Sequence, residues 1–111
     1  MAITDEYMNI EDALKRIGGS MDLYKRLLKS FIGGDHMPPL EEALNTGSVD
    51  EALRLVHTLK GVCANLSLIK LAAISVDLEH KLKDGTDTSD SFEELKQAYT
   101  ATSEKIAEII G

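Results

Sequence analysis

Apolar residues recur at helical spacing along the whole chain, and polar residues or glycines interrupt the pattern at intervals. The first run follows Asn9, a residue type that favours the N-cap of a helix, and Gly18-Gly19 ends it. This pattern predicts a short N-terminal helix. Its apolar face would consist of Ile10, Ala13, Leu14 and Ile17.

A second run begins after Ser20, another N-cap residue, and is interrupted at residues 33–39, which contain two glycines and two prolines. Proline lacks a backbone donor and breaks or kinks a helix. The pattern therefore fits either two helices or one long kinked helix. Its apolar positions are Tyr24, Leu27, Leu28 and Phe31 before the interruption, and Leu40, Ala43 and Leu44 after it.

Two later segments begin with a Ser-x-x-Glu sequence, which is typical of a capping box at a helix N-terminus. Ser48 and Glu51 predict a helix from about Val49 to about Asn65. A short polar break then precedes another apolar face that starts at Leu68, so the two helices should form an antiparallel hairpin.

The polar residues 84–90 predict a loop, after which Ser91 and Glu94 form the second capping sequence and begin a last helix. No segment shows the alternation typical of strands. The pattern predicts an all-α fold, an up-and-down antiparallel four-helix bundle with a short additional N-terminal helix. With 111 residues, 43% of them hydrophobic, the chain is expected to form a single domain over residues 1–111.

Charge and composition limit the classes of partner that the protein is expected to bind. The chain has 19 acidic and 12 basic residues, a net charge of −7, which disfavours nucleic acid and anionic lipid surfaces. No apolar stretch approaches the roughly 20 residues of a membrane span, and the N-terminus does not look like a signal peptide. The single cysteine, Cys63, excludes an internal disulfide. We expect a cytoplasmic protein.

His57 is the candidate for chemistry. On a helical wheel at ~100° per residue, it points away from the apolar arc of its helix, on which Cys63 lies as a packing residue. A neutral imidazole offers a ring nitrogen as a nucleophile toward phosphorus. The residues predicted on the same exposed side are Asp50, Leu53, Arg54, Lys60, Gly61 and Ala64.

Two neighbours of His57 fit that chemistry. Lys60, one turn later, supplies a cation for a phosphoryl group. Gly61 lies inside the helix, where glycine costs roughly 1 kcal/mol relative to alanine. A missing side chain beside the nucleophile would let another protein approach closely.

The stretch Val56-His57-Thr58-Leu59-Lys60-Gly61, continued by Ala64-Asn65-Leu66, resembles the signature of histidine-containing phosphotransfer (HPt) domains of multistep two-component phosphorelays. Further parts of the chain are similar to the family: Gly18-Gly19-Ser20 with Leu23-Tyr24, Leu27-Leu28 and Phe31, and Leu78-Glu79. The chain departs from the family where small residues are common, at Val62 and Cys63, and where glycine is common, at Ser67.

The resemblance implies a helical bundle whose exposed histidine accepts a phosphoryl group from the aspartate of one receiver domain and passes it to another. His57 would be phosphorylated, Lys60 would stabilise the phosphoryl group, and Gly61 would leave room for the receiver. The expected partners are response-regulator receiver domains and a hybrid sensor kinase. No cofactor or metal is expected on this chain, because the magnesium of such transfers belongs to the receiver.

The docking surface is expected to surround His57. Leu53 and Ala64 would lie in it, with Ile10, Ala13 and Leu14 at its edge, on a protein expected to be a monomer. Folding the hairpin about Ser67 brings Asp77 and Glu79 beside His57. A carboxylate there, such as Glu79, could orient the imidazole by accepting its other N–H. The alternative is a solvated acidic residue.

Two rival functions remain at this point. One is a non-catalytic helical adaptor that binds a receiver or kinase domain without being phosphorylated. The other is a metal- or cofactor-binding bundle, which is disfavoured because His36, His80 and the carboxylates show no metal-site spacing. No phosphate-binding glycine loop is present, so autonomous kinase activity is not expected.

Overall fold

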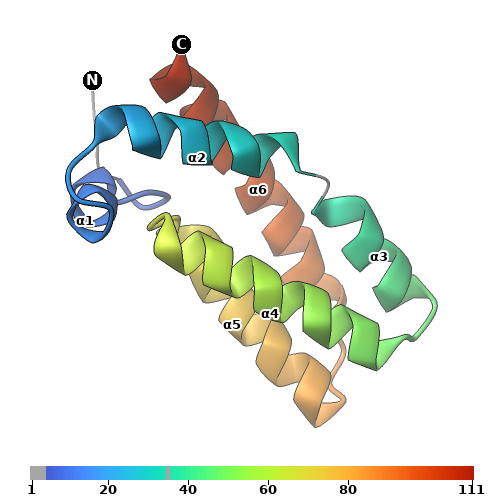
Figure 1. Cartoon of the computed structure of the whole chain (residues 1–111). Helices are drawn as coiled ribbons and strands as arrows, with labels where there is room; N and C mark the ends of the chain where they lie inside the picture. The colour runs from blue at the N-terminus through green and yellow to red at the C-terminus, as the bar shows by residue number, and fades with distance from the viewer. Residues whose placement is uncertain (1–4, 35) are drawn as a thin grey trace.

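The computed structural model describes residues 5–34 and 36–111, and the regular elements of this part of the chain are α-helices. This result confirms the predicted all-α class. Figure 1 shows their arrangement. The helices are α1 (Ile10–Arg16), α2 (Met21–Gly33), α3 (Met37–Asn45), α4 (Val49–Asn65), α5 (Ile69–Asp84) and α6 (Ser89–Ile110).

Helices α4 and α5 form the hairpin that the sequence predicts. Residues 66–68 make the turn, and the Leu68 N–H donates to the Cys63 carbonyl at 2.8 Å. The two helices lie side by side, α3 packs against α4, and α6 packs against α5 and α2 (Figure 1). The hairpin is therefore flanked by α3 on the side of α4 and by α6 on the side of α5.

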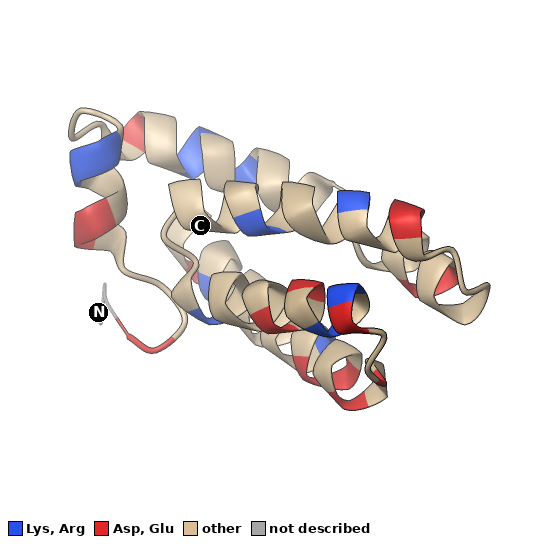
Figure 2. Ribbon diagram, turned by 90° about the horizontal axis from the view of Figure 1, so that it is seen from below, with Lys and Arg blue, Asp and Glu red and all other residues tan. Residues whose placement is uncertain are grey.

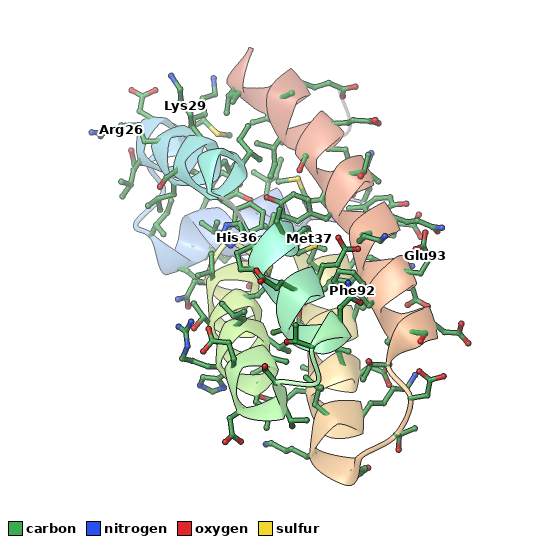
Figure 3. The ribbon with its side chains drawn as sticks, turned by 90° about the vertical axis from the view of Figure 1, so that its right-hand side faces the viewer. Arg26, Lys29, His36, Met37, Phe92 and Glu93 are labelled. Atoms are coloured by element: carbon green, nitrogen blue, oxygen red, sulfur yellow. The ribbon has the colours of Figure 1, made fainter. Side chains whose placement is uncertain are left out.

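The interruption at residues 33–39 separates two helices. Gly34 is extended, with ψ 154°, and both prolines lie in the first turn of α3, where a missing N–H breaks no helical bond. The His36 ring stacks on Phe31 at a centroid distance of 4.8 Å, and its Nε2–H donates to the Phe31 carbonyl at 3.1 Å. His36 thus packs at the junction of α2 and α3 (Figure 3).

Two of the predicted N-caps form as expected. The Asn9 side chain accepts the Asp12 N–H at 3.0 Å, and the Ser20 hydroxyl accepts the Leu23 N–H at 3.1 Å. Each bond satisfies one of the donors left unpaired at a helix start.

The first predicted capping box is wrong, although α4 does begin at Val49. Ser48 makes no side-chain cap bond, and its hydroxyl is 3.0 Å from that of Thr46. Glu51 instead pairs with Arg54 on the outer surface of α4.

The second predicted capping box is also wrong. Helix α6 begins earlier, at Ser89, so Ser91 is a helical residue and not its cap. The buried Ser91 hydroxyl accepts a bond from Lys81 at 2.6 Å and donates to Asp77 at 2.7 Å. Ser91 therefore links α6 to α5.

The core is formed largely by the apolar faces that the sequence predicts; the exception on α2 is Leu27, which is 37% exposed. The Tyr24 hydroxyl donates to the Leu66 carbonyl at 2.8 Å, and burial raises the pKa of Tyr24 to about 12. Burial likewise raises the pKa of the Cys63 thiol to about 12, in keeping with a packing residue. Other fully buried core residues are Leu28, Val56, Leu68, Leu71, Leu78, Leu95 and Ile106.

Helix α1 is attached to the α4–α5 turn through Ser67. The Ser67 hydroxyl donates to Asp12 at 2.6 Å, and the Ser67 carbonyl accepts the Asn9 N–H at 2.9 Å. Ser67 has φ +53°, the left-handed region in which glycine is favoured. The serine found here in place of glycine is thus held by a side-chain bond that glycine cannot make.

Candidate functional site

His57 lies in the middle of α4 on the side that faces α5. Its side chain is 72% exposed, and its Nδ1 is 3.2 Å from a carboxylate oxygen of Glu79 on α5. The side chain therefore points away from the core while one ring nitrogen stays anchored to the neighbouring helix. Of the two nitrogens, Nε2 is the one left to meet a partner.

Glu79 is the buried centre of the site. Its side chain is only 8% exposed, and its second oxygen accepts a bond from Lys60 Nζ at 2.8 Å. This bond from Lys60, reinforced by the bond from His57, lowers the pKa of Glu79 even though burial acts in the opposite direction. Glu79 is therefore an anion that bridges His57 and Lys60.

An ionised carboxylate can only accept hydrogen bonds. The contact between Glu79 and the imidazole thus requires the proton on His57 Nδ1, which leaves the lone pair of the neutral ring on Nε2. Of the two carboxylates expected near His57, Glu79 takes this position. Asp77 points to the other side of α5, where it pairs with Lys81 and Ser91.

Lys60 is less exposed than the sequence suggests. Its side chain is 30% exposed because its amine reaches back to Glu79. An ammonium group has three N–H donors. The two that do not bind Glu79 are still available to a group bound at His57.

Gly61 lies in the outer surface of α4, and nothing inside the protein requires a glycine there. A Cβ built on Gly61 meets no atom within 4 Å, and its backbone is not left-handed. The helix nevertheless bears the roughly 1 kcal/mol cost of glycine relative to alanine. A requirement from outside the chain explains this choice better than internal packing.

The other predicted surface residues divide into two groups. Ala64 is exposed and Leu53 half-buried on α4, as a docking surface around His57 requires. Ile10 and Ala13 are buried at 2% and 0% exposure, so their expected place at the edge of that surface is wrong. They face the core because Ser67 holds α1 against it. Of the three α1 residues expected there, Leu14 is the one that is partly exposed.

Sequence reasoning missed a largely apolar groove between α2 and α4, with a volume of about 420 Å³. It depends on how two separate helices are placed, and no pattern within one helix indicates this. Its main apolar lining residues are Ile17, Leu27, Phe31, Val62 and Leu66.

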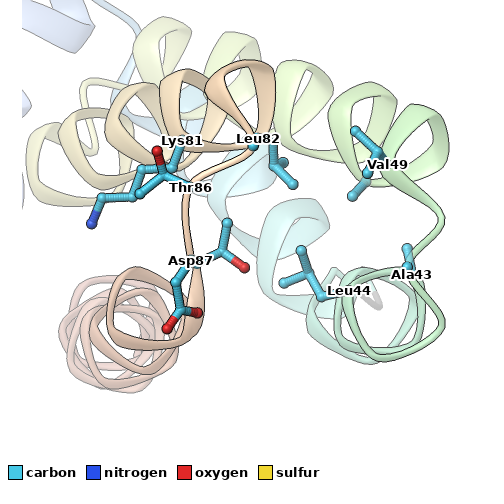
Figure 4. A pocket seen from close by; sticks show the side chains of 11 residues that line it. Ala43, Leu44, Val49, Lys81, Leu82, Thr86 and Asp87 are labelled. Atoms are coloured by element: carbon cyan, nitrogen blue, oxygen red, sulfur yellow. The ribbon is translucent and has the colours of Figure 1, made fainter.

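A second cavity, of about 230 Å³, lies between the α3–α4 turn and the α5–α6 loop (Figure 4). Leu44, Val49 and Leu82 line it, while the Lys81 amine points away from them toward its partners Asp77 and Ser91. The polar part of its lining comes from Thr86, Asp87 and Thr88 of the α5–α6 loop.

Charge is spread over the outer surfaces of the helices, with both signs interspersed (Figure 2). Residues 5–34 and 36–111 contain no group of three or more His, Cys, Asp or Glu side chains that could hold a metal ion. In the same residues, no helix has the length and apolarity needed to cross a membrane.

Comparison with known proteins decides the family. The sequence-family model of the Hpt domain matches residues 33–105, well over half of the chain, from the end of α2 into α6. The chain belongs to the Hpt domain family. Hpt domains are phosphocarrier modules of two-component phosphorelays, in which they take part in histidine phosphotransfer with receiver domains and kinases. No curated protein and no solved structure matches this Hpt domain.

Proposed function

We propose that this Hpt domain accepts a phosphoryl group on Nε2 of His57 from the aspartyl phosphate of one receiver domain and passes it to the aspartate of another. The observation that carries the proposal is the contact of His57 Nδ1 with the buried Glu79 carboxylate. It directs an unprotonated ring nitrogen to solvent from the middle of α4.

The proposed step conserves atoms and charge. The Nε2 lone pair attacks the phosphorus of the receiver's aspartyl phosphate, an N–P bond forms, and the P–O bond to the aspartate breaks. The carboxylate leaves with the electron pair of that bond. The ring becomes an imidazolium whose Nδ1–H remains bonded to Glu79, which stabilises the positive charge. Donation to a second receiver reverses these events.

Lys60 is proposed to stabilise the phosphoryl group. The group brings about two negative charges to a site where Glu79 is already anionic. Lys60 lies one helical turn from His57 and has two N–H donors beyond the one that binds Glu79. It can therefore bind phosphoryl oxygens without releasing the carboxylate.

Gly61, Ala64 and Leu53 are proposed to form the α4 part of the surface on which receivers dock, with Leu14 at its edge. Two of these residues carry little or no side chain, and a Cβ on Gly61 would project into open space. A receiver can thus bring its own aspartate close to Nε2. Donor and acceptor receivers must share this surface because both react at the same nitrogen.

We further propose that residues 1–111 act as one monomeric domain. In this arrangement α2 and α3 together, α4, α5 and α6 form the four columns of an up-and-down antiparallel bundle, and α1 is the additional helix. The protein would carry a phosphoryl group without autonomous kinase activity, and the receiver would supply the magnesium.

The test uses receiver domains phosphorylated with acetyl phosphate that carries a radioactive phosphoryl group. Wild-type protein should acquire label that is stable in alkali and labile in acid. His57→Gln should acquire none, and His80→Gln, at an exposed histidine of α5, should match the wild type. If a panel of receivers labels no wild-type protein, or if His57→Gln is labelled equally, the proposal is wrong. Binding without labelling would favour a non-catalytic adaptor.

A further inference from the structure

The outer side of α5 presents three residues in one line, and the site described above uses none of them. Ile69, Val76 and Lys83 are seven residues apart, so they lie along one face of the helix. Ile69 is 42% and Val76 is 38% exposed, two of the four large hydrophobic residues exposed in the described part of the chain. Lys83 is also exposed. We call these three residues the α5 face.

The bonds of Glu79 place the α5 face beside His57. Glu79 reaches both His57 and Lys60 across the hairpin. Val76 lies about one turn from Glu79 toward the turn at residues 66–68. Because α4 and α5 run in opposite directions, this places Val76 at about the same height along the hairpin as Lys60. Lys83 lies about one turn from Glu79 in the other direction. The α5 face thus extends to both sides of the nucleophile.

Lys83 acts electrostatically on the site. Its charge contributes to the lowered pKa of Glu79, after the larger effects of Lys60 and His57. Within residues 5–34 and 36–111, Lys83 makes no ion pair, whereas Lys60 is bound to Glu79. Lys83 is therefore a cation near His57 that is available to a partner.

We propose that the α5 face is the second half of the surface on which a receiver domain docks, and this inference rests on the proposed function. The carboxylates that surround a receiver's phosphorylated aspartate would meet Lys83. An apolar part of the receiver beside that pocket would cover Val76 and Ile69. The argument rests on charge complementarity and on continuity with the surface formed by Gly61 and Ala64.

The dimensions are compatible with one partner. A standard interface buries about 800 Å² per protein, which corresponds to a disc about 32 Å across. From Ile69 to Lys83 the helix rises 14 residues, or about 21 Å. The length of the α5 face is therefore smaller than the diameter of one standard interface.

The groove between α2 and α4 is the rival docking flank. Its α4 residue Val62 lies about 140° around the helix axis from His57 at ~100° per residue. His57 and Lys60 both reach toward Glu79 on α5 and away from that groove. The positions of these side chains thus favour the α5 flank. The groove is tested through Leu27, the exposed apolar residue on its α2 wall.

The experiment measures the second-order rate of phosphoryl transfer from a phosphorylated receiver to glutamine variants, because glutamine suits a helix surface. Val76→Gln and Lys83→Gln should each lower the rate by about tenfold, the loss expected when an important contact residue is removed. The Lys83 effect should shrink in high salt.

Matched controls lie elsewhere on the surface. Val49→Gln removes a valine of similar exposure, 46% against 38% for Val76, at the start of α4, and Lys29→Gln removes a lysine that points into solvent from α2 (Figure 3). Both should keep rates within about twofold of the wild type, as surface changes away from an interface do. Thermal unfolding of every variant checks that the fold is intact.

The outcomes separate this inference from the proposed function. Wild-type labelling at His57, with slow transfer to both Val76→Gln and Lys83→Gln, supports the α5 face. Wild-type labelling with an unchanged rate in either variant overturns it, most clearly if Leu27→Gln is the slow variant, and leaves the proposed function standing. If His57 becomes labelled neither in the wild type nor in any of these variants, the proposed function itself is wrong.

Discussion

Lys60 Nζ lies 2.8 Å from Glu79 Oε1, so the cation expected to meet a phosphoryl group is already paired with a buried carboxylate. The pair spans α4 and α5, and the other oxygen of Glu79 holds the imidazole of His57. One buried anion therefore sets the positions of both the proposed nucleophile, His57, and the neighbouring cation, Lys60.

Replacement of Glu79 by glutamine should slow phosphoryl transfer. His57 and Lys60 bind different oxygens of Glu79, and the amide replaces one of these two acceptors by an NH2 donor, so one of the two bonds is lost together with the negative charge. A hydrogen bond to a charged group contributes about 1.5–3 kcal/mol, which corresponds to a rate loss of roughly 10- to 100-fold if the bond acts in the transition state. The rate is measured by stopping the transfer reaction at a series of times and quantifying the labelled protein. A Glu79→Gln rate equal to that of the wild type would exclude this positioning role.

The same carboxylate should make stability depend on pH. The pKa of Glu79 in the folded protein is lowered from its ordinary value of 4.5, mainly by the bond from Lys60. Its contribution to stability is therefore complete above pH 4.5 and is lost as the pH falls through the lower folded-state pKa. Urea unfolding between about pH 7 and pH 3 should show a smaller loss for Glu79→Gln than for the wild type. Equal losses in the two proteins would contradict the lowered pKa.

Substitution of Gly61 should separate stability from function. Gly61→Ala should raise the free energy of unfolding by up to about 1 kcal/mol, because alanine favours the helix and its Cβ meets open space. Transfer from a receiver should nevertheless become slower, and slower still in Gly61→Leu. Thermal unfolding and transfer rates are measured on the same samples. Stable Gly61→Leu protein with wild-type transfer would show that docking needs no gap there.

Replacement of Ser67 by glycine should reduce the stability of the protein less than replacement by alanine. Ser67→Ala loses the bond to Asp12 but keeps the left-handed backbone at φ +53°, so it should be less stable than the wild type by about 1–3 kcal/mol. Ser67→Gly loses the same bond but relieves about 1–2 kcal/mol of backbone strain. Urea unfolding should therefore rank Ser67→Gly above Ser67→Ala. The reverse order would mean that the backbone at Ser67 is unstrained.

Local patterns predict most of the helical framework because their causes are local. The caps at Asn9 and Ser20 involve residues three positions apart, and the short α4–α5 turn brings Glu79 near His57. The two predicted capping boxes did not form because their side chains bind other partners. Ser48 contacts Thr46 and Glu51 pairs with Arg54, while Ser91 binds Lys81 and Asp77 of α5.

Features that depend on contacts between helices were not predictable in this way. Apolar residues such as Ile10 and Ala13 could contact either a partner protein or the core. The Ser67–Asp12 bond holds α1 so that both residues pack in the core. Lys60 points outward on a wheel, yet its long side chain folds back to Glu79. Both cases need the packing of a second helix.

Direct mapping of the phosphoryl group tests the central claim. Trypsin cleaves after Arg54 and Lys60, so residues 55–60 form a peptide in which His57 is the only histidine, while His36 and His80 fall in other peptides. After incubation with a phosphorylated receiver, mass spectrometry in mild alkali should find the added phosphoryl group on residues 55–60, and acid treatment should remove it. A phosphoryl group on any other peptide, or an acid-stable one on this peptide, would contradict the assignment of His57.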